Sequence, residues 1–273
     1  MCFAESSTRF HSETNGYSVA IPRGWRQVPG EIVRQVFGIA FSESNLSFDV
    51  EMVLAVEFSE SSLAYPYLVA QVKRYSKYGV NQPLKKNEIE DIFDSAIKTV
   101  NQAAHVDNLV NYLPEHMQEV VSAMHFGKVY LDRENMCFLQ GTAIELPTVG
   151  KVKQVSLSSC GRQALVKMTF ICPESDWDRF GYERSLILDS FHFDAGADYM
   201  GAASAVPTYK RTERNDVSFW KDMAVDIGVY GTIGGVLFAV AVVGSIVRKM
   251  KAKPRKGGTP SAQGEVTHTE GGN

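Results

Sequence analysis

Cysteine is the most reactive side chain in this sequence, and its spacing tests for metal and redox chemistry. The four cysteines are Cys2, Cys137, Cys160 and Cys172, and no two of them form a C-x-x-C pair. The sequence therefore gives no indication of a zinc ribbon or of a thioredoxin-type redox centre.

Cys137 and Cys160 have a spacing that favours a disulfide. Each lies ten residues from the turn expected at Pro147 to Gly150, one before it and one after it. In an antiparallel hairpin this places the two cysteines opposite each other. Their Cα atoms would be about 4.5 Å apart in a non-hydrogen-bonded pair, near the short end of the range for a disulfide. Such a bond needs an oxidising compartment. The alternative is two buried free thiols that pack as small apolar groups.

Histidine, a common metal ligand and general base, is scattered along the chain. The six residues are His11, His105, His116, His125, His192 and His268. His116 and His125 are nine residues apart on one expected helix, so they lie on opposite faces and cannot share a metal. We therefore predict no metal site and no cofactor.

No familiar catalytic pattern supplies a nucleophile. The sequence lacks a G-x-S-x-G elbow, an H-E-x-x-H motif and a P-loop. Glu115 and His116 are neighbours, and His192 lies two residues before Asp194, but neither pair comes with an assigned nucleophile. We predict that the protein is not an enzyme. The alternative, a small hydrolase-like enzyme, would need a deep polar pocket lined by histidines and carboxylates.

These residues must be positioned by a domain rich in strand patterns. Residues 17–22 (YSVAIP) are strand formers, and apolar residues occupy every second position from Phe48 to Phe58. This alternation predicts a strand with one face in the core. Four more strands are expected later, joined by short polar or Gly/Pro turns that are typical of hairpins. They cover residues 128–131, 136–146, 151–160 and 163–172.

Helical spacing of apolar residues predicts helices around these strands. The most regular begins at Asn87, where Glu90 completes a capping box, and carries an apolar stripe to Ala104. A last helix is expected after the S-x-x-D box of Ser175 and Asp178. The other two expected helices cover residues 66–75 and 114–127. Because strands and helices come in runs and not as β-α-β units, the pattern predicts an α+β sandwich with a mainly antiparallel sheet.

The chain also carries one long apolar segment. From Ile227 to Val247 it has 21 residues without a charge, and a basic cluster follows at once. At helical rise this segment is about 31 Å long, which matches the hydrocarbon core of a bilayer. We predict one transmembrane helix over residues 223–248. The cluster, which we expect to contact lipid headgroups, comprises Arg248, Lys249, Lys251, Lys253, Arg255 and Lys256.

Small residues recur at every fourth position of this segment. Gly231, Gly235 and Ala239 form a row that lets two membrane helices approach closely. The row predicts a homo-oligomer that packs through the span. The alternative is that glycine is simply common in such helices.

Charge sets the expected orientation. Residues 248–273 carry six basic residues against Glu265 and Glu270, a net of +4, which leaves −7 for the rest of a chain whose total is −3. The acidic balance argues against nucleic acid as a partner. The positive-inside tendency places the tail in the cytoplasm and the head outside.

The first ten residues contain no signal peptide that would carry the head across a membrane. Cys2-Phe3-Ala4 resembles the end of a cleavage site, so we expect a processed or late start. The alternative is a tail-anchored protein whose head stays in the cytoplasm.

Composition divides the chain into five expected segments. Ala, Gly, Ser and charged residues after residue 194 indicate a linker, and the composition after residue 256 is low in apolar residues. The segments are a leader remnant or disordered start (1–8), a folded head (9–194), a linker (195–222), the span (223–248) and a basic, then disordered tail (249–273).

Two short motifs in the head resemble those of PsbP-like proteins. Residues 17–25 (YSVAIPRGW) match the opening strand followed by Pro and Gly-Trp, and residues 190–193 (SFHF) match the closing Ser-Phe-x-Phe element. The resemblance covers residues 9–194. It implies an α/β/α sandwich around an antiparallel sheet, used for protein–protein interaction or assembly without a shared catalytic apparatus.

Together these predictions describe a membrane-anchored, non-catalytic interaction or assembly domain of a single-pass protein. Its expected partners are the lipid bilayer and an unidentified membrane or periplasmic protein. Two other functions stay open. One is a small hydrolase-like membrane-anchored enzyme, and the other is a signalling or tethering protein that acts through its cytoplasmic tail.

Overall fold

A seven-stranded antiparallel sheet forms the frame of the head. The computed structural model describes residues 8–42, 49–60, 62–75, 83–103, 123–147 and 149–199. The strand order in the sheet is β3-β4-β7-β11-β10-β9-β8. In chain order the strands are β3 (Arg26–Gln27), β4 (Asp49–Ala55), β7 (Tyr67–Arg74), β8 (Ala123–Asp132), β9 (Cys137–Leu146), β10 (Gly150–Cys160) and β11 (Ala164–Pro173).

A smaller sheet and a few helices complete the described part of the chain. The small sheet has the order β1-β2-β12 and is made by β1 (Thr8–Ser12), β2 (Tyr17–Ile21) and β12 (His192–Phe193). Two short strands, β5 (Phe58–Ser59) and β6 (Ser62–Leu63), pair with each other. The helices are α1 (Gly30–Ser42), α2 (Lys86–Ala103), the 3₁₀ helix η3 (Glu174–Asp176) and α4 (Gly181–Asp189).

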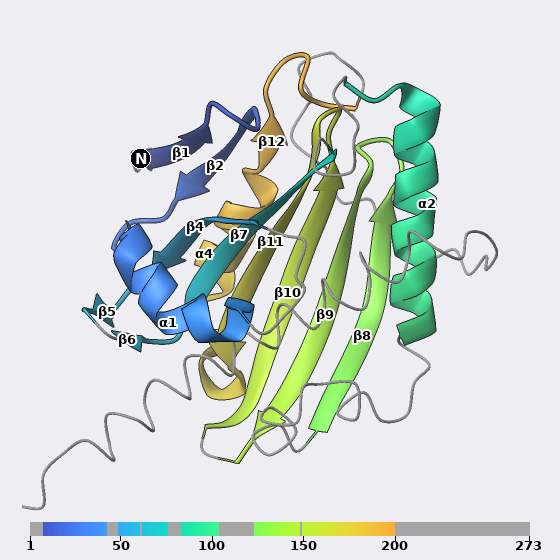
Figure 1. Ribbon diagram of the computed structural model, residues 1–273. Coiled ribbons are helices and arrows are strands. Elements are labelled where there is room, and N and C mark those ends of the chain that lie inside the picture. Colours follow the sequence, from blue (N-terminus) through green and yellow to red (C-terminus); the bar gives the residue numbers. More distant parts are fainter. Residues whose placement is uncertain are drawn as a thin grey trace, which may run out of the picture.

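These elements form three layers, with the large sheet in the middle (Figure 1). On one face, Phe37 of α1 packs against Tyr67, and Phe93 of α2 packs against Phe138. On the other face, α4 and the small sheet share an apolar cluster with β4, β7 and β11. The predicted α+β fold with a mainly antiparallel sheet is therefore confirmed, although the second sheet was not expected.

The predicted helix at residues 66–75 is wrong, because this segment is the strand β7. Every residue from Tyr67 to Lys73 is buried. β7 pairs with β4 on one side and with β11 on the other, and both faces of the sheet are covered. A strand buried in this way has no alternating pattern from which to recognise it.

The strand expected from Phe48 to Phe58 is shorter than its alternation suggests. β4 ends at Ala55, and its register with β7 shifts between Val50 and Met52. Because of this bulge, Val50 packs against the cluster with α1 on one face of the large sheet. Met52 packs on the other face, in the cluster with α4. Residue 48 lies outside the described residues.

Helix α2 is confirmed, but its expected cap is displaced. The helix starts at Lys86, so Asn87 lies inside it, and the backbone N–H of Lys85 donates to Oε2 of Glu88 at 2.7 Å. Glu90 instead accepts a hydrogen bond from the hydroxyl of Tyr199. The predicted stripe packs as expected, since Ile89, Phe93 and Ala96 are all fully buried.

The expected helix at residues 114–127 does not continue to Gly127, because β8 already begins at Ala123. The part before residue 123 lies outside the described residues. The last helix also begins later than its capping box suggested. α4 starts at Gly181 after the short η3, and neither helix has a side-chain cap.

The four predicted hairpin strands correspond to β8, β9, β10 and β11. Beyond β12, the first residues of the predicted linker belong to the head, since Asp198 and Tyr199 are buried. Among the described residues, no helix has the length and apolar character needed to cross a bilayer. The predicted span at residues 223–248 and the tail lie outside them.

Candidate functional site

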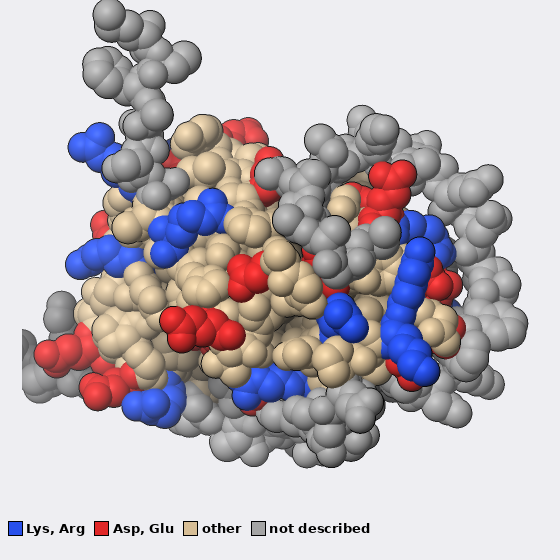
Figure 2. All heavy atoms as spheres, turned by 90° about the horizontal axis from the view of Figure 1, so that it is seen from above, with Lys and Arg blue, Asp and Glu red and all other residues tan. Residues whose placement is uncertain are grey.

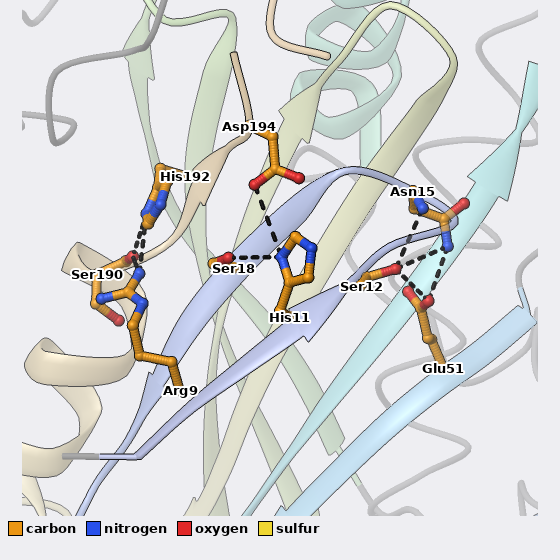
Figure 3. Close-up of polar contacts among 9 residues, drawn as sticks. All are labelled: Arg9, His11, Ser12, Asn15, Ser18, Glu51, Ser190, His192 and Asp194. Carbon is orange, nitrogen blue, oxygen red and sulfur yellow. Dashed lines mark hydrogen bonds and ion pairs between the residues drawn. The ribbon is translucent and has the colours of Figure 1, made fainter. Parts of the chain in front are cut away.

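Two residues of the small sheet and Asp194, which directly follows it, have the types of a catalytic triad, but their geometry does not fit one. Nδ1 of His11 on β1 lies 3.0 Å from Oγ of Ser18 on β2. The same nitrogen lies 3.7 Å from Oδ1 of Asp194 (Figure 3). In a working triad the hydroxyl and the carboxylate contact different ring nitrogens, because the histidine takes a proton on one side while the carboxylate orients it from the other. Here both groups compete for one nitrogen.

The second histidine of this region has a structural environment. Nη2 of Arg9 donates to the backbone oxygen of Ser190 at 3.2 Å and lies 3.0 Å from Nδ1 of His192 (Figure 3). Nδ1 of His192 also lies 3.0 Å from the backbone oxygen of Ser190. A guanidinium only donates and a carbonyl oxygen only accepts, so the tautomer of His192 decides which of the two contacts is a hydrogen bond. His192 and Asp194 therefore contact two different residues of β1, Arg9 and His11. Both contacts join β1 to the segment that follows α4.

A third polar group joins the small sheet to the large one. Oε1 of Glu51 accepts from the hydroxyl of Ser12 and, at 2.8 Å, from Nδ2 of Asn15. The side-chain oxygen of Asn15 in turn accepts from Nε of Arg74 at 2.9 Å. Because this network links the β1–β2 turn to β4 and β7, we assign it to docking of the two sheets. Figure 3 shows the contacts among Ser12, Asn15 and Glu51.

The cysteines do not form the predicted disulfide. The pairing of β9 with β10 sets Cys137 opposite Ser159, so the assumed register is wrong by one residue. Adjacent strand residues point to opposite faces. Accordingly Cys137 packs in the cluster with α4, whereas Cys160 packs in the cluster with α2.

Cys137, Cys160 and Cys172 are buried free thiols. Burial raises the pKa of Cys160 to about 12 and that of Cys172 to about 12, and it raises the pKa of Cys137 further. A thiol of such high pKa stays protonated at neutral pH and is a poor nucleophile. These three cysteines are therefore packing residues.

The most unusual group of side chains lies on the helix-covered face of the large sheet. Nine polar residues on four neighbouring strands are buried there, and we call them the polar band. They are Gln71, Lys73, Gln140, Thr142, Gln154, Ser156, Ser158, Lys167 and Thr169.

Register places these residues in adjacent rows. Lys167 on β11 lies opposite Gln71 on one side and Ser158 on the other. In the next row, Oγ of Ser156 and Oγ1 of Thr169 are 3.0 Å apart. The band separates the apolar cluster under α1 from the apolar cluster under α2.

Burial has strong electrostatic consequences in the polar band. Lys167 is only 5 % exposed, and desolvation lowers its pKa to about 7. Gln71 is 0 % exposed, and within the described part of the chain neither of its amide atoms has a hydrogen-bond partner. Nε2 of Gln154 lacks one as well.

Sequence reasoning missed the polar band, although a signal existed. Gln154, Ser156 and Ser158 alternate with apolar residues along β10, and Lys167 and Thr169 do so along β11. Such alternation normally marks a solvent-facing side of a strand. The pattern is unusual here because this side of the two strands is buried.

The other predicted site residues lie outside the described residues. They are the packing row Gly231, Gly235 and Ala239 and the basic cluster Arg248, Lys249, Lys251, Lys253, Arg255 and Lys256. Within the described ranges no three metal-ligating side chains come together. Figure 2 shows acidic and basic side chains interspersed over the described part of one surface, without a broad field of either sign.

Comparison with known proteins finds likenesses among solved structures. No protein-family model matches the sequence, and no curated protein matches it. The solution structure of cyanobacterial PsbP (CyanoP) from Synechocystis sp. PCC 6803 is similar over 71 % of this chain and 97 % of that chain, at 15 % identity and a TM-score of 0.39. A TM-score this low carries no argument about fold or function.

Proposed function

We propose that the chain is a membrane-anchored, non-catalytic interaction or assembly domain. The observation that carries the proposal is the uncharged stretch from Ile227 to Val247, followed directly by six basic residues. Such a segment gains free energy in hydrocarbon, and cations at one end favour the headgroups of the cytoplasmic leaflet. The head is therefore extracytoplasmic and the tail cytoplasmic in our proposal.

The described polar contacts support a role without catalysis. His11 contacts Ser18 and Asp194 through a single nitrogen, and the Glu51 network joins two sheets. The buried cysteines carry raised pKa values. The Ser18 hydroxyl does lie beside His11, but Asp194 contacts the same ring nitrogen and so does not orient the histidine from its other side.

We also propose that the head is related to PsbP-like proteins. The support comes from the motifs at residues 17–25 and 190–193, which both pack in one cluster. Tyr17, Trp25 and Phe193 are buried there against the large sheet. A relationship of this kind fits a role in assembly at a membrane, with a membrane or extracytoplasmic protein as the partner.

Alkaline carbonate extraction of membranes tests the anchoring. We expect the full chain to stay in the pellet after washing at high pH. A variant with both Leu237→Arg and Val240→Arg should move to the supernatant, since each charge at the centre of a span costs about 2.5–3.5 kcal/mol. The matched control, Thr259→Arg with Thr267→Arg in the tail, should stay in the pellet. Release of the unaltered chain would overturn the proposal.

A further inference from the structure

We draw no further inference here: the strongest candidate, the buried polar band of the large sheet, does not define a binding site, because Lys167 already has an interaction within the chain and Gln71 lies two rows of the sheet away from Gln154.

Discussion

Lys167 is a lysine in the middle of a sheet, and its titration should be visible in the stability of the head. Burial lowers its pKa to about 7 from an ordinary value of 10.5. Below pH 7 the folded state bears the full cost of a buried charge. Between pH 7 and 10.5 the unfolded chain binds more protons, so this contribution to the free energy of unfolding rises with pH.

Lys167→Met removes this contribution. We expect the variant to be more stable than wild type at pH 6, with an advantage that shrinks by up to about 1.4 kcal/mol per pH unit above pH 7. Urea denaturation in chloride buffer at pH 6, 7.5 and 9 measures the difference, in which all unchanged groups cancel. Lys128→Met serves as the control. An advantage that stays constant over this range contradicts the lowered pKa.

The three described cysteines make a second prediction about individual side chains. Because Cys137, Cys160 and Cys172 are buried thiols, they should react with N-ethylmaleimide far more slowly in the folded chain than in urea. Mass spectrometry without reductant should then find all three alkylated after unfolding. Two of them resisting alkylation until a reductant is added would show a disulfide that the structure lacks.

Close packing where β10 turns into β11 gives a prediction for these elements. A Cβ on Gly161 would lie 2.8 Å from the ring of Phe193 and 2.9 Å from the backbone oxygen of Ala197. Gly161→Ala should therefore lower the free energy of unfolding by about 1–3 kcal/mol. Gly141→Ala is the matched control on β9, where nothing lies within 4 Å of the new atom. Equal effects of the two changes in urea denaturation would contradict the packing.

How much of each element could be foreseen depends on how local its signal is. The hairpin strands β9, β10 and β11 were predictable because short turns and strand formers lie next to each other in sequence. β7 was mistaken for a helix because its burial comes from β4 and β11, which are distant in the chain. The disulfide failed because one residue of register decides which face Cys160 occupies.

The polar band is harder still to predict from the sequence. Gln71, Gln154 and Lys167 come from three strands, and no single segment reveals that they share one buried face. The sequence predicts the polar alternation of β10 but not that this face of the strand is buried. A site made by tertiary packing is therefore found only in the folded structure.

The whole chain combines a folded head with a segment suited to a bilayer. The described head ends at Tyr199, whose hydroxyl donates to Glu90 and whose ring lies 5.4 Å from Nζ of Lys86. These contacts hold the end of the head beside the start of α2. The last described residue therefore lies beside the start of α2.

We predict that the whole protein self-associates through its expected transmembrane helix. Gly231→Leu with Gly235→Leu should weaken dimerisation in a membrane reporter at least tenfold, because the new side chains keep the helices apart. Gly244→Leu, on the opposite face of the predicted helix, is the matched control and should have little effect. Unchanged association in the double variant would rule out this row as the contact.

Protease protection in intact cells examines the proposed arrangement of the full chain, with one tag inserted in the head and one at Asn273. We expect external protease, once any outer membrane is permeabilised, to remove the head tag and to leave the tag at Asn273 intact. Both tags should be lost only after the inner membrane is opened. A head tag that survives external protease, or a full chain recovered in the soluble fraction, would contradict this arrangement.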